Sequence, residues 1–182
     1  MNIVSVFPTA IGNFCDFITE SERLELLENI KNISHYPHDQ LTGNGFSTHT
    51  LQNSFISKTI EDRIQSAVNE YAEFYGLESV KIGNIWSNIQ HSGSSLNEHT
   101  HPNSIVSGAL YINVDETCKL YFHNPNPYNG FTHYDKRNDF NYKFVWINVK
   151  NCQLILFPSW LKHGKYNEVN MMDDRVVISF NC

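Results

Sequence analysis

The chain has 182 residues, 41% of them hydrophobic and 18% charged, and a formal net charge of -6. This length suits one domain with its own hydrophobic core, and the acidic balance without any run of Lys and Arg argues against a general nucleic-acid binder. The four cysteines stand singly and no apolar stretch could cross a bilayer, so we expect a soluble, intracellular protein with no nucleic-acid patch and no membrane segment.

The first part of the chain predicts a small amount of β-structure and two helices. An alternating apolar run at residues 3–7 predicts a strand, which ends before Pro8. Residues 32–45 are polar and rich in turn formers, which predicts a loop. We interpret residues 1–79 as a support region for the rest of the chain.

Both predicted helices have recognisable start signals. Thr19 or Ser21 can cap a first helix, and acidic residues follow in its first turn. Ser57 can cap a second helix, which should stop at Gly76. The apolar residues of the second helix fall on one stripe at helical spacing: Ile60, Ile64, Ala67, Val68, Tyr71 and Phe74. We expect both helices to pack against a sheet as scaffolding.

From residue 80 onward the pattern changes to strands. They are predicted at residues 80–90, 104–114, 119–122, 144–149, 153–157 and 175–181. Short strands without intervening helices indicate a mainly β fold, a double-stranded β-helix (jelly-roll) barrel behind N-terminal helices. Residues 124–140 are rich in Asn, Pro, Gly and Tyr, and this segment is long enough for an active-site loop. We expect a single domain over residues 1–182, with residues 80–182 as its β core.

Three histidines stand where a barrel could bring them together. His99 and His101 form a His-x-His at a strand end, where both side chains emerge on one face and can bind one ion. His163 lies just past a hydrophobic strand. Imidazole suits iron, zinc, copper and nickel, and three protein ligands on one side of an ion leave positions for substrate and dioxygen. The spacing predicts a catalytic metal site, in which Glu98 or Asn103 could replace His101.

The last predicted strand carries a cation on its polar face. Alternation places Arg175 and Ser179 on one face with Val177 and Asn181. The opposite face is apolar and consists of Val176, Ile178 and Phe180. A buried Arg is costly unless its guanidinium meets an acid, and its fork geometry matches a carboxylate. A bound dicarboxylate would supply that acid.

These motifs resemble those of the Fe(II)- and 2-oxoglutarate-dependent dioxygenases, whose pattern is His-x-Asp/Glu, a distant His, and then Arg or Lys. Within that superfamily the chain is most similar to a group of oxygenases marked by four motifs. They stand here as Trp86-Ser87-Asn88, His99-Thr100-His101-Pro102, Ser107-Gly108-Ala109-Leu110-Tyr111 and Phe157-Pro158-Ser159-Trp160-Leu161-Lys162-His163. The resemblance covers the chain from about residue 80 to its end.

The resemblance implies an enzyme that hydroxylates a substrate and forms succinate and CO2. It implies that His99 and His163 bind Fe(II) and that 2-oxoglutarate is the co-substrate, with Arg175 at its distal carboxylate. Tyr111 is then expected to reach the co-substrate as well. The substrate stays open, as a small molecule or a peptidyl side chain, and so does the oligomeric state, a homo-oligomer included.

Three further residues have weaker assignments. Ser179 and Asn88 are candidates for 2-oxoglutarate binding, although satisfied polar groups of a barrel would have the same pattern. His101 departs from the superfamily, which has a carboxylate at this position. Three neutral imidazoles would leave an Fe(II) site one charge more positive than two imidazoles and one carboxylate.

Two rival functions are compatible with parts of the pattern. The spacing from Gly93 to His101 imitates a cupin-type metalloprotein, but Ile105 and Val106 stand where the cupin glutamate should fall. The other rival is a non-catalytic jelly-roll module with a binding or structural role. The remaining histidines are interpreted as surface or core residues: His35, His38, His49, His91, His123 and His133.

Overall fold

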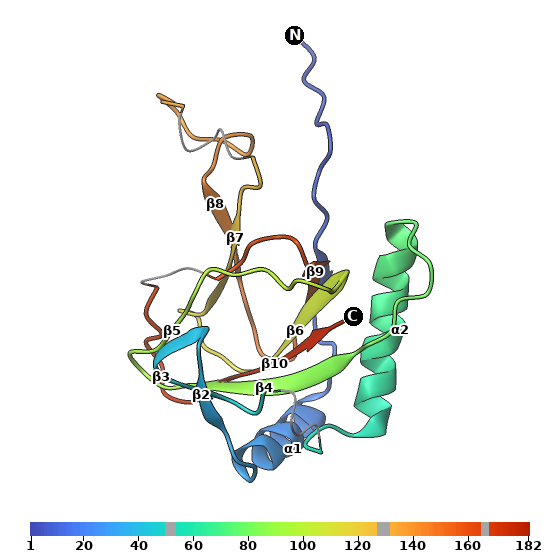
Figure 1. The fold of residues 1–182 in the computed structure, drawn as a ribbon, viewed down its shortest axis with the longest axis vertical. Coiled ribbons are helices and arrows are strands. Elements are labelled where there is room, and N and C mark those ends of the chain that lie inside the picture. Colours follow the sequence, from blue (N-terminus) through green and yellow to red (C-terminus); the bar gives the residue numbers. More distant parts are fainter. Residues whose placement is uncertain (50–53, 127–131, 165–167) are drawn as a thin grey trace.

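The computed structural model describes residues 1–49, 54–126, 132–164 and 168–182 (Figure 1). Two helices and a majority of strands form within these residues, which confirms the predicted mainly β fold with N-terminal helices. The elements are β1 (Gly12–Phe14), α1 (Glu20–Lys31), β2 (Tyr36–His38), β3 (Leu41–Ser47), α2 (Lys58–Phe74), β4 (Asn84–Gln90), β5 (Ser95–Leu96), β6 (Val106–Asn113), β7 (Lys119–His123), β8 (Phe144–Asn148), β9 (Leu154–Pro158) and β10 (Arg175–Asn181).

The strands form a large sheet and a small one. The large sheet is antiparallel, with the order β1-β9-β6-β10-β4-β3-β2, and β5 pairs with β3. The small sheet consists of β7 and β8, which rise from one end of the molecule in Figure 1. Its Leu120 and Phe122 pack against Ala109, Tyr111 and Phe157 of the large sheet, so the two sheets enclose a second core.

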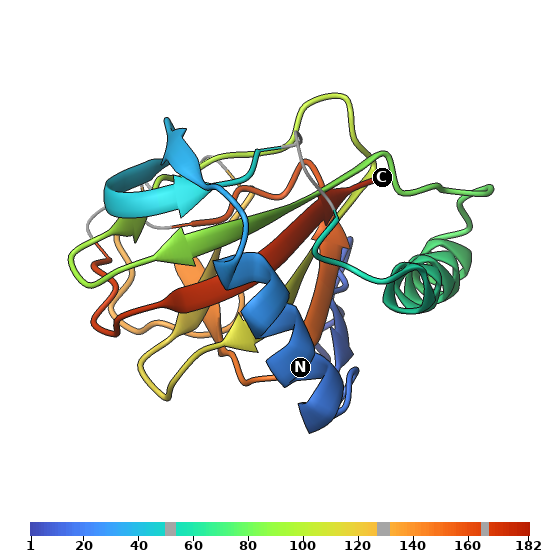
Figure 2. The same cartoon turned by 90° about the horizontal axis from the view of Figure 1, so that it is seen from below.

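Both helices cover the other face of the large sheet. Figure 2 shows α1 in front of this sheet and α2 at its side. The apolar face of β10 meets them there, because Ile178 and Phe180 belong to the same buried cluster as Leu26 of α1 and Ile64 of α2. Burial of such side chains contributes about 1.5–3 kcal/mol each, so this layer anchors β10 firmly. The polar face of β10 is left for the opposite side of the sheet.

The helix start signals operate as the sequence predicts. Thr19, rather than Ser21, is the N-cap of α1, and Thr19 and Glu22 form a reciprocal capping box. Ser57 caps α2 by accepting from the backbone N–H of Ile60. Beyond α2, Gly76 adopts a positive φ of 66°, a conformation that favours glycine and ends the helix. None of the described helices combines the length and apolar character needed to span a bilayer.

Two predictions for the first part of the chain are wrong. Residues 3–7 form no strand and their apolar side chains are exposed, because Gly12–Phe14 occupies the edge of β9 instead. Residues 32–45 are not a loop, since β2 and most of β3 lie there. Their composition hides the strands, because β3 has only two large apolar residues, Leu41 and Phe46, and therefore no apolar stripe.

The later strands lie close to their predicted ranges, with ends that differ by a few residues, as frayed boundaries do. Of the predicted active-site loop at 124–140, residues 127–131 lie outside the described part. Residues 124–126 and 132–140 form neither helix nor strand.

Candidate active site

A cavity of about 370 Å³ lies on the face of the large sheet that the helices leave free. This volume is within the range of sites for small ligands. All four side chains on the polar face of β10 line it: Arg175, Val177, Ser179 and Asn181. The described residues of segment 124–140 do not contribute to its wall, so the expected role of that segment as an active-site loop finds no support in them.

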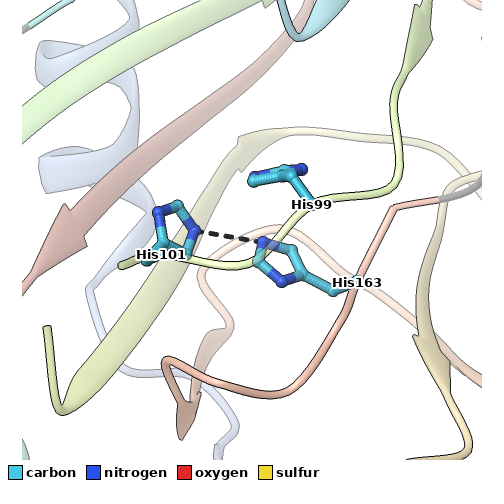
Figure 3. Close-up of side chains that lie close together, drawn as sticks. All are labelled: His99, His101 and His163. Atoms are coloured by element: carbon cyan, nitrogen blue, oxygen red, sulfur yellow. Dashed lines mark hydrogen bonds between the residues drawn. The ribbon is translucent and has the colours of Figure 1, made fainter. Parts of the chain in front are cut away.

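His99, His101 and His163 converge at this cavity (Figure 3). Their candidate ligand nitrogens all lie within 4.8 Å of one another, and the Nε2 atoms of His101 and His163 are 3.2 Å apart. Two nitrogens bound to one ion at about 2.1 Å and at tetrahedral or octahedral angles would be about 3.0–3.4 Å apart. The distance between His101 and His163 therefore fits two ligands of one metal ion, and a ligand nitrogen of His99 lies within 4.8 Å of both.

Backbone hydrogen bonds hold together the two segments that carry the three histidines. His99 and His163 exchange two N–H to O bonds of 3.0 Å each, and the N–H of His101 donates to the Ser159 carbonyl at 3.0 Å. On its other side, the His163 segment is bonded to β7 through the N–H of His123, which donates to Lys162 O. The histidine side chains are thus positioned by strand-like pairing, although His99 and His163 lie outside the strands of the two sheets.

Backbone carbonyls orient the rings of His99 and His163 so that Nε2 of each can bind a metal ion. Nδ1 of His99 lies 2.8 Å from the Asn97 carbonyl, and Nδ1 of His163 lies 3.0 Å from the Leu161 carbonyl. A ring nitrogen that faces a carbonyl must carry the proton, which leaves Nε2 of both rings with a free lone pair. Burial lowers the pKa of all three imidazoles, to about 4 for His101, so they are neutral near pH 7.

Arg175, the first residue of β10, lines the cavity and has hydrogen-bond donors without acceptors in the described part of the chain. Its Nη1 donates to Oε1 of Gln90 at 3.2 Å. Its Nε and the Nε2 of Gln90 are buried and have no acceptor among the residues that the structure describes. Two unmatched N–H groups beside a cation are costly in a protein interior unless a ligand accepts from them, and a carboxylate would do so.

Tyr111 and a hydrogen-bonded pair of polar side chains border the same cavity. Tyr111, 1% exposed, lies opposite Val177 on β6, and burial raises the pKa of its phenol, which therefore stays protonated. Asn88 and Ser179 bond to each other, with Nδ2 of Asn88 donating to the Ser179 hydroxyl at 3.2 Å. Tyr111, Asn88 and Ser179 all line the cavity, together with Arg175 and the three histidines.

Some residues of the cavity are not among those singled out from the sequence. Gln90 continues the alternation that places Asn84, Trp86 and Asn88 on the same face of β4, so extension of that period would have found it. His38 and His49, interpreted above as surface or core residues, both line the cavity, with ring centroids 4.7 Å apart. His38 belongs to β2, where the sequence predicts a loop, and His49 follows β3.

Glu98 and Asn103, the alternative ligands to His101, are not part of the histidine cluster. The Glu98 carboxylate lies 3.7 Å from both His123 Nε2 and Lys162 Nζ, and in the described part of the chain only the three histidines form a metal-binding group. Asn103 is exposed, with a positive φ of 66°. The residues present fit a divalent transition metal held by three imidazoles, and beside it a dicarboxylate held by Arg175.

Comparison with known proteins agrees with this chemistry. The model of a family described as "Putative 2OG-Fe(II) oxygenase" matches residues 84–181, more than half of the chain. This match favours the predicted oxygenase over the cupin-type and non-catalytic alternatives. No curated protein matches the chain in sequence.

Solved structures of such oxygenases share the fold. SnoN, an alpha-ketoglutarate-dependent epimerase from nogalamycin biosynthesis, is similar with a TM-score of 0.68 and 10% identity, over 94% of this chain and 75% of SnoN. A prolyl-4-hydroxylase from Pseudomonas putida has a TM-score of 0.60 and 15% identity, over 95% of this chain and 92% of that one. The viral collagen prolyl hydroxylase of Paramecium Bursaria Chlorella virus-1 has a TM-score of 0.61 and 11% identity, over 93% and 94%.

At these identities the likeness shows the fold alone, and it confirms the predicted jelly roll. The family match adds the chemistry, and its range contains the three histidines and Arg175. The chain therefore belongs to the 2OG-Fe(II) oxygenase family and is an Fe(II)- and 2-oxoglutarate-dependent oxygenase.

Proposed function

We propose that His99, His101 and His163 hold Fe(II) in this oxygenase and that Arg175 anchors 2-oxoglutarate, for the hydroxylation of a small-molecule or peptidyl substrate. The observation that carries the proposal is the pairing, in one cavity, of three converging imidazoles with buried N–H donors that have no acceptor in the described ranges. Either feature alone has structural explanations. Together they match a metal ion and a dicarboxylate side by side.

The histidines contribute ligands that need no rearrangement. Because Asn97 O and Leu161 O hold the Nδ1–H groups of His99 and His163, the Nε2 lone pairs are already directed at the common point. Their lowered pKa keeps them unprotonated near neutral pH, so a metal ion does not have to displace a proton from them.

Arg175 and Gln90 contribute the slot for the distal carboxylate. The guanidinium supplies charge and a planar fork, and Gln90 orients it while offering its own Nε2–H group. The neutral phenol of Tyr111 can donate a further hydrogen bond to the co-substrate. Ser179 and Asn88 would border its middle part.

Fe(II) with 2-oxoglutarate and dioxygen supplies the oxidative step, in which the co-substrate becomes succinate and CO2 and one oxygen atom enters the substrate. The apolar side chains of Ala109, Leu120, Phe157 and Val177 wall the cavity between the two sheets. They exclude water from the reacting groups and strengthen the electrostatic contacts there. We assign no side chain as general base.

His101 gives this site a distinctive charge. A carboxylate in its place would cancel one unit of the metal's charge, whereas imidazole cancels none. The anionic co-substrate would therefore be attracted more strongly to this centre than to one with two histidines and a carboxylate.

In addition, we propose an intracellular location, supported by the four cysteines, all of which are free.

An anaerobic titration tests the assignment directly. Fe(II) and 2-oxoglutarate are added to the purified protein, and the visible metal-to-ligand charge-transfer band is recorded. We expect a band that requires both additions and that is lost in His99→Ala and His163→Ala. Iron bound without any band on addition of 2-oxoglutarate would contradict the dicarboxylate assignment, and no iron binding would contradict the metal site.

A further inference from the structure

The end of the cavity opposite Arg175 carries a second set of polar groups. In the register between β4 and β10, Gln90 pairs with Arg175 at one end and Asn84 pairs with Asn181 at the other. Both asparagines line the cavity. At about 3.4 Å per residue, the six steps along β10 put this pair about 20 Å from the co-substrate anchor, measured along the strand.

The histidine triad lies near the asparagine end. The ring of His101 is 6.1 Å from that of Trp86, and Trp86 pairs with Ser179 in the register. The ring of His163 is 4.6 Å from that of Phe157, which pairs with Ser107 on β6, and Ser107 pairs in turn with Asn181. Groups bound by the asparagines would therefore lie beside the metal site, on the side away from Arg175.

A chain of hydroxyl groups fixes the orientation of the Asn181 amide. The Ser107 hydroxyl donates to Oδ1 of Asn181 at 2.8 Å, and the hydroxyls of Ser107 and Ser159 are 2.7 Å apart. Because Ser107 gives its only hydrogen to Asn181, Ser159 must be the donor to Ser107. Oδ1 of Asn181 is thus occupied, and its Nδ2 group is the part that can donate to a ligand.

Asn84 offers the complementary group. Its Oδ1 is buried and has no hydrogen-bond partner in the described part of the chain. Such an acceptor is costly unless a ligand donates to it. The 2-oxoglutarate dianion has no hydrogen-bond donor, so it can satisfy Arg175 and Gln90 but not Asn84. The co-substrate therefore cannot supply the donor that Asn84 Oδ1 lacks.

We propose that Asn84 and Asn181 bind a carboxamide of the substrate, with its N–H donating to Asn84 Oδ1 and its carbonyl accepting from Asn181 Nδ2. This inference rests on the proposed function and names the class of substrate for the same site. A carboxylate would leave Asn84 unmatched. A cationic group would find no carboxylate, because none of the described residues that line the cavity is Asp or Glu. A primary amide satisfies both asparagines at once, because one of its N–H groups lies on the same side as its carbonyl oxygen.

The test uses the full chain loaded with Zn(II), which the same ligands accept, and with 2-oxoglutarate. Binding of propionamide is measured by ligand-observed NMR, with methyl propionate, which lacks the N–H donor, and propionate as matched probes. We expect propionamide to bind at least fivefold more tightly than either, a difference of the size that one hydrogen bond gives. Equal affinities for the three probes would overturn the proposal.

Aspartate substitutions separate the two asparagines without removal of the side chain. Asn84→Asp keeps an acceptor and should keep propionamide affinity within about twofold, whereas Asn84→Leu should lose about fivefold. Asn181→Asp keeps the bond from Ser107 but loses the donor, and it should lose about fivefold. Asn148→Leu, on the exposed edge of β8, is the control and should change nothing. Equal behaviour of the two Asp variants would contradict the assigned orientations.

The same samples separate this inference from the proposed function. Affinity for 2-oxoglutarate should stay within about twofold in every asparagine variant; a loss as large as that for propionamide would make the pair part of the co-substrate slot and overturn the proposal. If the parent protein binds no 2-oxoglutarate, the proposed function fails. The propionamide series, repeated with Zn(II) alone, then still decides whether the asparagines bind a carboxamide.

Discussion

Substitution of Arg175 by Met removes the cation of the proposed co-substrate slot while it keeps an extended apolar stem. In the structure the guanidinium offers a buried, unpartnered Nε and a second nitrogen, Nη1, which is bonded to Gln90. A hydrogen bond between charged groups contributes about 1.5–3 kcal/mol, so loss of a two-point contact should cost about 3–4 kcal/mol. Affinity for 2-oxoglutarate should then fall by about two to three orders of magnitude.

Two companion variants refine this expectation. Gln90→Leu removes the neutral donor next to the guanidinium, and we expect a loss of about 1 kcal/mol, close to tenfold at most. Arg175→Lys keeps the charge but not the planar fork, so its affinity should fall between those of the parent and Arg175→Met. Because Arg175 and Gln90 are in contact, the double variant should lose less than the sum of the single losses.

The assay is anaerobic titration of the iron-loaded protein with 2-oxoglutarate, followed by the charge-transfer band, with iron affinity measured separately. In Arg175→Met we expect a large loss of affinity for 2-oxoglutarate and little change in affinity for iron. If both affinities fall by the same factor in Arg175→Met, Arg175 supports the fold of the cavity and does not bind the co-substrate.

Three further predictions concern the metal site, an ion pair and a packed glycine. His101→Ala should lower iron affinity at least tenfold whereas His101→Asp should retain iron, as measured by metal analysis after dialysis. Hydrogen bonds from Arg63 and from the Thr19 backbone hold the pKa of Glu22 at about 2, below its usual 4.5, so about 1 kcal/mol of stability should be present above pH 4.5 and lost as the pH falls towards 2. Gly108→Ala, whose new methyl would overlap the Phe180 ring, should lower the free energy of unfolding by about 1–3 kcal/mol in urea titrations.

Each of these has a control and a contrary outcome. Full iron occupancy in His101→Ala would mean that the site needs only two histidines. Glu22→Gln should abolish the extra loss of stability between pH 4.5 and 2, and an unchanged pH profile would show that the ion pair contributes nothing measurable. Gly83→Ala, whose nearest neighbour would be Asn181 O at 3.7 Å, should be nearly neutral, so an equal effect at both glycines would contradict the packing argument.

The parts of the fold that the sequence predicts well are those in which one face is buried and the other is not. In β10, Val176, Ile178 and Phe180 are buried against the helices, and the residues between them face the cavity. This contrast is visible as a two-residue period, so both the strand and the face of Arg175 could be predicted. The helix caps at Thr19 and Ser57 are equally local signals.

The misplaced elements depend on pairing, which is not a local property. Residues 3–7 alternate as a strand should, yet the available sheet edge is occupied by Gly12–Phe14. Conversely, β2 and β3 carry few apolar residues, and β3 is held in the sheet by its pairing with β4 and β5. Composition alone gives such strands no apolar stripe to detect.

The same reason explains which cavity residues were missed. Gln90 pairs with Arg175 across two strands, and only the register between β4 and β10 shows that they meet. His99 and His163 are recognisable from their motifs, but their spacing across the chain says nothing of distance. The exchange of backbone bonds between these two residues, which brings the imidazoles together, is visible only in three dimensions.

The proposed centre holds iron through three imidazoles, beside a co-substrate anchored by Arg175. An anaerobic crystal structure with Fe(II) and 2-oxoglutarate measures this directly. We predict Fe–N distances of about 2.0–2.2 Å to Nε2 of His99, His101 and His163, with the distal carboxylate within hydrogen-bond distance of Arg175. Iron bound without His101, or a carboxylate directed away from Arg175, would contradict the account.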